Sequence, residues 1–228
     1  RVRLFETGLR FIPSQNGIQQ LAQIPTLALI ATGSHLPEQW HAKAKPIDFY
    51  DLKAEIEMLL AAGRVQANYQ ATQRAWLHPG QSADILVNGK VVGYLGKLHP
   101  ALADELDLAE TWVAELDIAA LMLPYVSNFT QLSRFPSVRR DIAILISDKI
   151  ELDQIQASIR TAAGELLIQS GLFDVYAGQG VGVGQRSLAF GLLWQHAERT
   201  LEDVEIQDGL PRVVDALSQT YNATLRAS

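Results

Sequence analysis

The chain contains no cysteine. This excludes a disulfide framework, a thiolate metal site and a thiol nucleophile, and it is compatible with a reducing cytoplasm. No apolar run reaches the ~18 residues that a membrane-spanning helix needs, so we expect no membrane segment. The chain starts at Arg1 and enters a strand-like stretch at once, without a targeting segment. These features suggest a fragment of a longer, cytoplasmic protein.

An excess of positive charge is also missing. The formal net charge of -6 argues against a protein that coats nucleic acid through bulk charge. From residue 129 onward, however, Lys149 is the only lysine and every other basic residue is an arginine. Arginine suits bidentate contacts to phosphate and stacking on bases. Any nucleic-acid site must therefore be a local arginine patch on an acidic body.

Signatures of catalysis and metal binding are absent as well. There is no Gly-x-Ser-x-Gly motif, and none of the 5 histidines is spaced as a metal pair. The glycine-rich run at 178–184 lacks the Gly-Lys-Ser/Thr of a phosphate loop and joins two predicted strands, which indicates a hairpin loop. We therefore expect no catalytic residue and no metal ligand.

With 228 residues and 48% hydrophobic residues, the chain can form one large or two modest domains with real cores. The first half predicts an α+β arrangement, an antiparallel sheet with helices on one side. A bulge or turn is expected at Gly8, Pro25 at the start of a strand, Asp48 as a helix N-cap, and a hairpin at Asn88-Gly89. The expected strands are 1–12, 24–30, 82–87, 90–98 and 111–118, and the expected helices are 48–62 and 100–108.

The second half predicts the order β-α-β-β-α-β, the ferredoxin-like split βαβ pattern with both helices on one sheet face and the other face open. Its strands are expected at 141–146, 167–176, 187–195 and, more weakly, 223–227, and its helices at 152–163 and 201–221. Thr200 begins a capping motif for the last helix, and Pro211 is expected to kink or interrupt it.

Arginines flank the strands of this second half. Arg134, Arg139 and Arg140 precede its first strand, and Arg186 precedes and Arg199 follows its third. Solubilising surface charge is the alternative role for each of them. On the open face, either Phe173 or Tyr176, but not both, should offer a ring for stacking. The third strand is expected to bury Leu188, Phe190, Leu192 and Trp194 and to turn Ser187, Ala189, Gly191 and Leu193 to the open side.

Seven short motifs then carry a resemblance to a known family. They run through the chain in this order: DFYDLK at 48–53, WLHPG at 76–80, GYLGKLHP at 93–100, RRD at 139–141, LFDVY at 172–176, SLAF at 187–190 and RTL at 199–201. Together they resemble the C-terminal region of the bacterial phenylalanine–tRNA ligase beta subunit, across essentially the whole chain.

This resemblance implies two domains with different functions. Residues 1–125 would be part of a non-catalytic class II synthetase-like domain that packs on the alpha subunit, and 126–133 would be a linker. Residues 134–228 would be the ferredoxin-fold anticodon-binding domain, which binds the anticodon stem-loop of tRNA(Phe). The expected tRNA-binding residues are Arg134, Arg139, Arg140, Tyr176, Arg186 and Arg199.

For the whole enzyme, the resemblance implies two alpha and two beta subunits, ATP and magnesium, and adenylation and aminoacyl transfer by the alpha subunit. The fragment alone would be inactive and would hold no cofactor. One departure is Gly191, where the family usually has a charged or polar residue. Two other functions stay open: a metabolite-binding regulatory module on a degenerate enzyme domain, and a region that only assembles the subunits.

Overall fold

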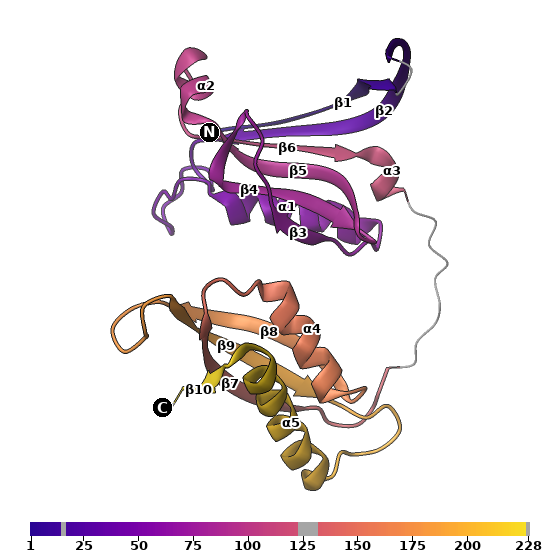
Figure 1. The fold of residues 1–228 in the computed structure, drawn as a ribbon, viewed down its shortest axis with the longest axis vertical. Helices are drawn as coiled ribbons and strands as arrows, with labels where there is room; N and C mark the ends of the chain where they lie inside the picture. Colours follow the sequence, from indigo (N-terminus) through magenta and orange to yellow (C-terminus); the bar gives the residue numbers. More distant parts are fainter. Residues whose placement is uncertain (15–16, 123–131, 227–228) are drawn as a thin grey trace. The chain divides into compact units, whose positions relative to one another are not determined.

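The computed structural model describes residues 1–14, 17–122 and 132–226. The chain forms two compact units, Arg1–Ser127 and Asn128–Ser228 (Figure 1). Residues 126–131 of the predicted linker lie outside the described residues.

The first unit is built on a six-stranded antiparallel sheet with the strand order β1-β2-β6-β5-β4-β3. The helix α1 (Phe49–Ala62) packs on one face of this sheet, and two short helices, α2 (Pro100–Glu105) and α3 (Ile118–Leu121), flank β6 in the chain (Figure 1). The predicted α+β class is therefore confirmed. The strands are β1 (Val2–Ser14), β2 (Gly17–Thr32), β3 (Asn68–Ala71), β4 (Leu77–Val87), β5 (Lys90–Leu98) and β6 (Thr111–Asp117).

Helix α1 begins where the sequence predicts. The side chain of Asp48 accepts hydrogen bonds from the backbone N–H groups of Tyr50 and Asp51, and the carboxylate of Asp51 accepts one from the backbone N–H of Asp48. This capping box satisfies N–H groups that have no partner inside the helix. The helix then buries one apolar face against the sheet: Leu52, Ile56 and Leu60.

Three details of the first unit differ from expectation. Gly8 forms no bulge or turn, because it pairs with Thr26 in a register that stays regular as far as Pro13. Pro25 lies inside β2, next to Thr26, where the pairing of β2 with β6 ends and a missing N–H costs no ladder bond on that side. Strand β3 was not predicted. The Asn88-Gly89 hairpin is confirmed, with the positive φ values of 51° and 76° that its tight turn requires.

Glycine in β5 permits the close approach of neighbouring strands. A Cβ at Gly93 would lie 2.3 Å from the carbonyl oxygen of Glu115 and 3.0 Å from the Cα of Leu116, both backbone atoms of β6. A Cβ at Gly96 would similarly lie 2.9 Å from the carbonyl oxygen of Gln81. Backbone atoms cannot rotate away as a side chain can, so these positions exclude larger residues.

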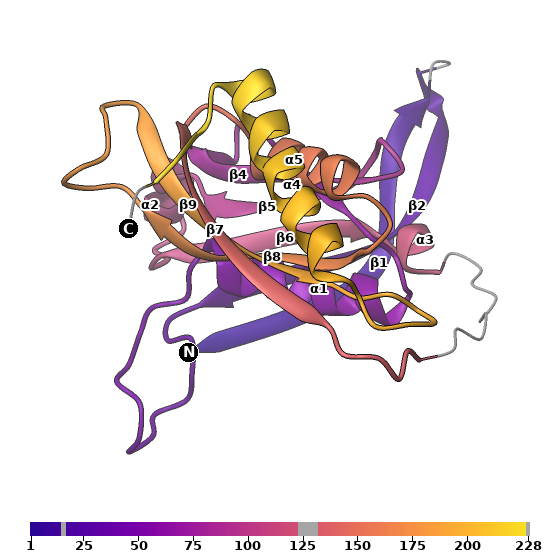
Figure 2. The same ribbon diagram turned by 90° about the horizontal axis from the view of Figure 1, so that it is seen from below.

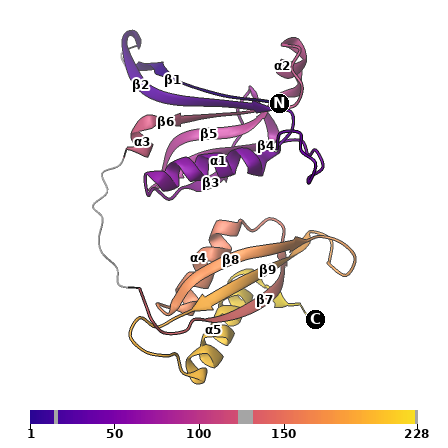
Figure 3. The same ribbon diagram turned by 180° about the vertical axis from the view of Figure 1, so that it is seen from behind.

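The second unit is a four-stranded antiparallel sheet with the order β10-β7-β9-β8. Helices α4 (Leu152–Ala163) and α5 (Asp203–Tyr221) lie side by side on one face of it (Figure 2). Figure 3 shows the unit from behind relative to Figure 1. This is the predicted ferredoxin-like fold, and it is confirmed. The strands are β7 (Val138–Ser147), β8 (Leu167–Tyr176), β9 (Gln185–Trp194) and β10 (Thr224–Leu225).

The start of α5 is held by an ion pair and not by the predicted Thr200 cap. The guanidinium of Arg199 donates two hydrogen bonds of 2.7 Å to the carboxylate of Glu205, which also accepts from the backbone N–H of Glu202. The hydrogen bond from Arg199, followed by that from Glu202, lowers the pKa of Glu205 to about 2. Pro211 does not interrupt the helix, which continues to Tyr221.

The packing at Gly93 generates a first prediction. Gly93→Ala should destabilise the first unit by about 1–3 kcal/mol, the usual cost of overpacking a tight contact. Gly8→Ala is the matched control, because no atom lies within 4 Å of the Cβ that it adds. Native-state hydrogen exchange of β5 and β6 peptides measures the effect. Equal protection in the two variants would contradict the proposed packing.

The Arg199–Glu205 pair generates a second prediction. The pKa of Glu205 in the folded protein, about 2, lies below its ordinary value of 4.5, so the pair stabilises fully above pH 4.5 and loses its effect as the pH falls through about 2. The melting temperature of Arg199→Ala should therefore fall below that of the parent at neutral pH and converge with it in acid. Arg212→Ala on α5 is the control. A deficit of Arg199→Ala that does not change with pH would rule out this linkage.

Candidate nucleic-acid interface

The side chains of strand β9 alternate between the two faces of the second sheet. Leu188, Phe190, Leu192 and Trp194 are all at most 2% exposed and pack against α4 and α5, as predicted. Successive side chains of a strand alternate between faces. Ser187, Ala189, Gly191 and Leu193 therefore line the face away from the helices, which we call the open face.

Both candidate aromatic rings lie on the open face. Leu172 pairs with Phe190 but Asp174 pairs with Ala189, so β8 carries one extra residue, Phe173, in a β-bulge. Tyr176 then pairs with the open-face residue Ser187. The ring of Phe173 lies under the guanidinium of Arg139, 5.5 Å away, an arginine on the same face. The expectation that only one ring could face out is wrong, because it assumed strict alternation along β8.

Arg139 lies flat across the open face. Its strand partner is Leu193, and its Nε donates a hydrogen bond of 2.8 Å to Oδ1 of Asp141. A Cβ at Gly191 would lie 2.8 Å from Nη2 of Arg139. The space left by Gly191 is therefore filled by the chain's own guanidinium, which reaches through it to Phe173.

Arg226 is a residue of this face that the sequence interpretation missed. Its backbone N–H donates to the carbonyl oxygen of Ala143 over 2.9 Å, which continues the pairing of β10 with β7. Its guanidinium lies 4.9 Å from the ring centre of Tyr176, and Nη1 lies 3.4 Å from Oγ of Ser187. The available signal was its place in the weakly predicted strand 223–227, whose two faces the sequence interpretation did not assign.

The remaining expected arginines do not gather at the two rings. Arg140 is exposed and donates to the carbonyl oxygen of Arg139, but it pairs with Leu192 and so has the parity of the helix-covered face. Arg134 is exposed ahead of β7. Arg186 has the parity of the helix-covered face and donates to the carbonyl oxygen of Ile150 over 2.6 Å. Arg199 is engaged with Glu205 at the start of α5.

Carboxylates lie on both sides of this unit. Helix α5 carries four of them: Asp203, Glu205, Asp208 and Asp215. The open face carries Asp141 and Asp174, which pair with Gly191 and Ala189, together with the guanidinium groups of Arg139 and Arg226, each over an aromatic ring. Rings offer stacking surfaces to unpaired bases, and guanidinium groups bind phosphate. The open face therefore has the chemistry of a site for single-stranded nucleic acid.

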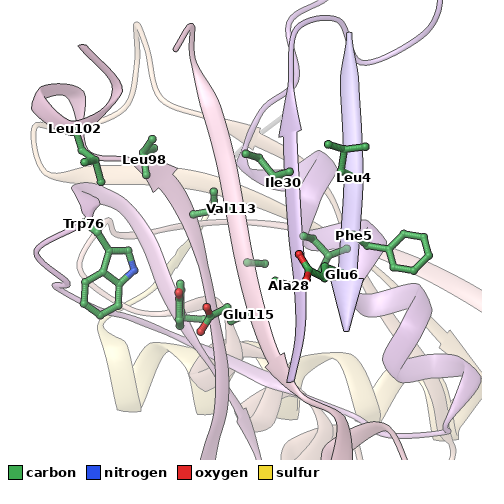
Figure 4. Close-up of a pocket in the computed structure, with 13 residues that line it drawn as sticks. Leu4, Phe5, Glu6, Ala28, Ile30, Trp76, Leu98, Leu102, Val113 and Glu115 are labelled. Atoms are coloured by element: carbon green, nitrogen blue, oxygen red, sulfur yellow. The ribbon is translucent and has the colours of Figure 1, made fainter. Parts of the chain in front are cut away.

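The first unit holds a hollow of about 550 Å³ on the sheet face opposite α1 (Figure 4). Trp76, Leu98, Leu102 and Val113 give it apolar walls. Burial, and then the carboxylate of Glu115, raise the pKa of Tyr94 in its floor to about 12. Glu115 also accepts from Nη1 of Arg10 over 3.1 Å. Partners within the protein thus already engage these polar groups.

Across 1–14, 17–122 and 132–226, no three His, Asp or Glu side chains gather closely enough to hold a metal ion. Within the same residues, no helix is long and apolar enough to cross a membrane.

Comparison with known proteins gives the same two-part division. Residues 1–118 match the family model described as the phenylalanyl tRNA synthetase beta chain CLM domain, and residues 133–226 match the ferredoxin-fold anticodon binding domain.

Three relatives named phenylalanine–tRNA ligase beta subunit match the chain along its whole length. The protein from Acinetobacter baylyi is 62% identical, that from Psychrobacter arcticus 45% and that from Hahella chejuensis 40%, each over 100% of the chain. The chain spans 28–29% of the length of these relatives. Since its first unit matches a model of that subunit and relatives of one name align from end to end, the chain belongs to the phenylalanine–tRNA ligase beta subunit family.

Proposed function

We propose that this chain binds the anticodon stem-loop of tRNA(Phe) through the open face of its second unit. The observation that carries the proposal is the pairing, on a sheet face without helices, of two aromatic rings with two guanidinium groups. The family description of residues 133–226 as an anticodon binding domain supports the choice of tRNA as ligand.

A loop of unpaired nucleotides fits this face better than a duplex does. In an RNA helix the bases are stacked on one another, whereas those of a loop can be splayed out onto aromatic side chains. Tyr176 and Phe173 would receive such bases, and the neighbouring arginines would contact the phosphates. The acidic helix α5, on the opposite face, would repel the RNA backbone and favour one orientation of binding.

The proposed contact residues are Tyr176, Arg139, Arg140 and Arg134, to which the geometry adds Phe173. Arg140 and Arg134 are exposed near the start of β7, where they can reach a backbone that leaves the open face. Arg186 and Arg199 are assigned supporting roles, because the first is bonded to a backbone carbonyl and the second to a carboxylate.

In the whole enzyme, we propose a cytoplasmic assembly of two alpha and two beta subunits. The alpha subunit would use ATP and magnesium to attach phenylalanine to tRNA(Phe), and the first unit of this chain would support it without catalysing a step. Large apolar side chains on the edge strand β1 favour a protein partner there: Leu4, Phe5, Leu9 and Phe11, each more than half exposed. The rival metabolite-binding module gains less support, since the ferredoxin-like unit exposes arginines and rings.

Tyr176 supplies a direct test. Tyr176→Ala should weaken binding of the tRNA(Phe) stem-loop by about 5- to 100-fold, the usual range for the loss of one base–aromatic stack. Tyr50→Ala, which removes a 74% exposed ring on α1, should leave binding unchanged. Fluorescence anisotropy with the cognate stem-loop and with one from another tRNA measures both. Parent-like affinity of Tyr176→Ala would exclude this ring as a stacking platform.

Substitution of Gly191 tests the position of the Arg139 guanidinium without changing the charge of the protein. Gly191→Ala places a methyl group where the guanidinium of Arg139 lies and should displace it from Phe173. We expect weaker stem-loop binding, comparable to that of Arg139→Ala. Gly171→Ala is the matched control: it lies directly opposite Gly191 on β8, and no atom lies within 4 Å of its added Cβ. If both glycine variants bind like the parent, the position of Arg139 over Gly191 has no role in binding.

A further inference from the structure

The contacts of Arg226 differ from those of Arg139 and Arg199. Within the described residues, its guanidinium contacts the ring of Tyr176 and the hydroxyl of Ser187, whereas Arg139 and Arg199 each bind a carboxylate. Within residues 132–226, no carboxylate forms an ion pair with this guanidinium. An arginine in this state, on an exposed face, is available to an anionic ligand.

The ring of Tyr176 is held at its hydroxyl, whereas the guanidinium over it belongs to an exposed side chain with one long polar contact. The hydroxyl of Tyr176 donates to the carbonyl oxygen of Gln179 over 3.1 Å, and a Cβ at Gly178 would lie 2.7 Å from that hydroxyl. The loop after β8 therefore holds the outer end of the ring. The backbone N–H of Arg226 donates to the carbonyl oxygen of Ala143. Its side chain is exposed, and the hydrogen bond from its Nη1 to Oγ of Ser187 is long, at 3.4 Å.

We propose that Arg226 is a further RNA-contacting residue that exchanges places with a base. In the free protein its guanidinium covers the ring of Tyr176. When an unpaired base stacks on that ring, the guanidinium swings away and contacts a phosphate of the same loop. This inference rests on the proposed binding of the stem-loop. It adds Arg226 to the residues that contact the RNA, and it states that the guanidinium leaves the ring when the base stacks there.

The exchange is favourable on general grounds. A cation over an exposed aromatic ring is held more weakly than a base stacked on it. The displaced guanidinium gains a charge-assisted contact to phosphate. The positive charge of Arg226 therefore keeps a partner after it leaves the ring of Tyr176. Ser187, which is 4% exposed beneath the guanidinium, becomes accessible at the same moment and can bond to the base edge.

Titration of the tRNA(Phe) stem-loop at several salt concentrations tests the exchange. Arg226→Ala should lower the affinity about 3- to 10-fold and reduce the slope of log K against log [salt] by about 0.7, the value for one phosphate contact to a single strand. Arg226→Lys keeps the charge and should keep the slope. Arg212→Ala, which removes an exposed arginine from α5, should change neither quantity.

A second measurement follows the arginine itself and does not depend on affinity. In the free protein the Nε–H proton of Arg226 should show a ring-current shift in the NMR spectrum, and this shift should be lost in Tyr176→Leu. Addition of the tRNA(Phe) stem-loop to the parent protein should also abolish this shift. A shift that persists in the complex would overturn the exchange, as would an Arg226→Ala variant with parental or tighter affinity and an unchanged slope. Failure of the parent to bind any stem-loop would instead overturn the proposed function, and the exchange with it.

Discussion

One extra residue in β8 determines what the open face of the second unit presents. With strict alternation, Phe173 and Tyr176 would point to opposite faces, and one ring would be buried against the helices. The bulge at Phe173 shifts the parity, so that Leu172 still reaches the core while both rings lie outside. Bulges redirect side chains at little cost near functional surfaces. Arg139 and Arg226 could not each cover a ring on the same face without this bulge.

The opposite face explains how an acidic protein can offer such a surface. The apolar side chains of β7 and β9 seal one face against α4 and α5, and the carboxylates of α5 lie on the outer side of that layer. The open face brings together two guanidinium groups, of Arg139 and Arg226, and two carboxylates, of Asp141 and Asp174, in a chain whose net charge is -6. Binding to an anion is decided by the local arrangement, because exposed charges beyond about 10 Å are largely screened.

The sequence was sufficient for the elements whose pattern is local. The hairpin at Asn88-Gly89, the cap at Asp48 and the alternation from Leu188 to Trp194 each depend on neighbouring residues, and all three are confirmed. The bulge at Phe173 depends on the partner strand, and the role of Glu205 at α5 depends on Arg199, six residues away in the chain. Neither has a signature within its own segment, so sequence reasoning failed there.

Gly191 links a local feature of the sequence to a contact with a residue on another strand. Its lack of a side chain is a local fact, but its consequence is that Arg139 can lie across the sheet to Phe173. Any larger residue at this position would occupy the volume that the guanidinium now fills. Position 191 and the conformation of Arg139 are therefore coupled. A side chain at that position would displace the guanidinium of Arg139 from Phe173 and so change what the centre of the open face presents.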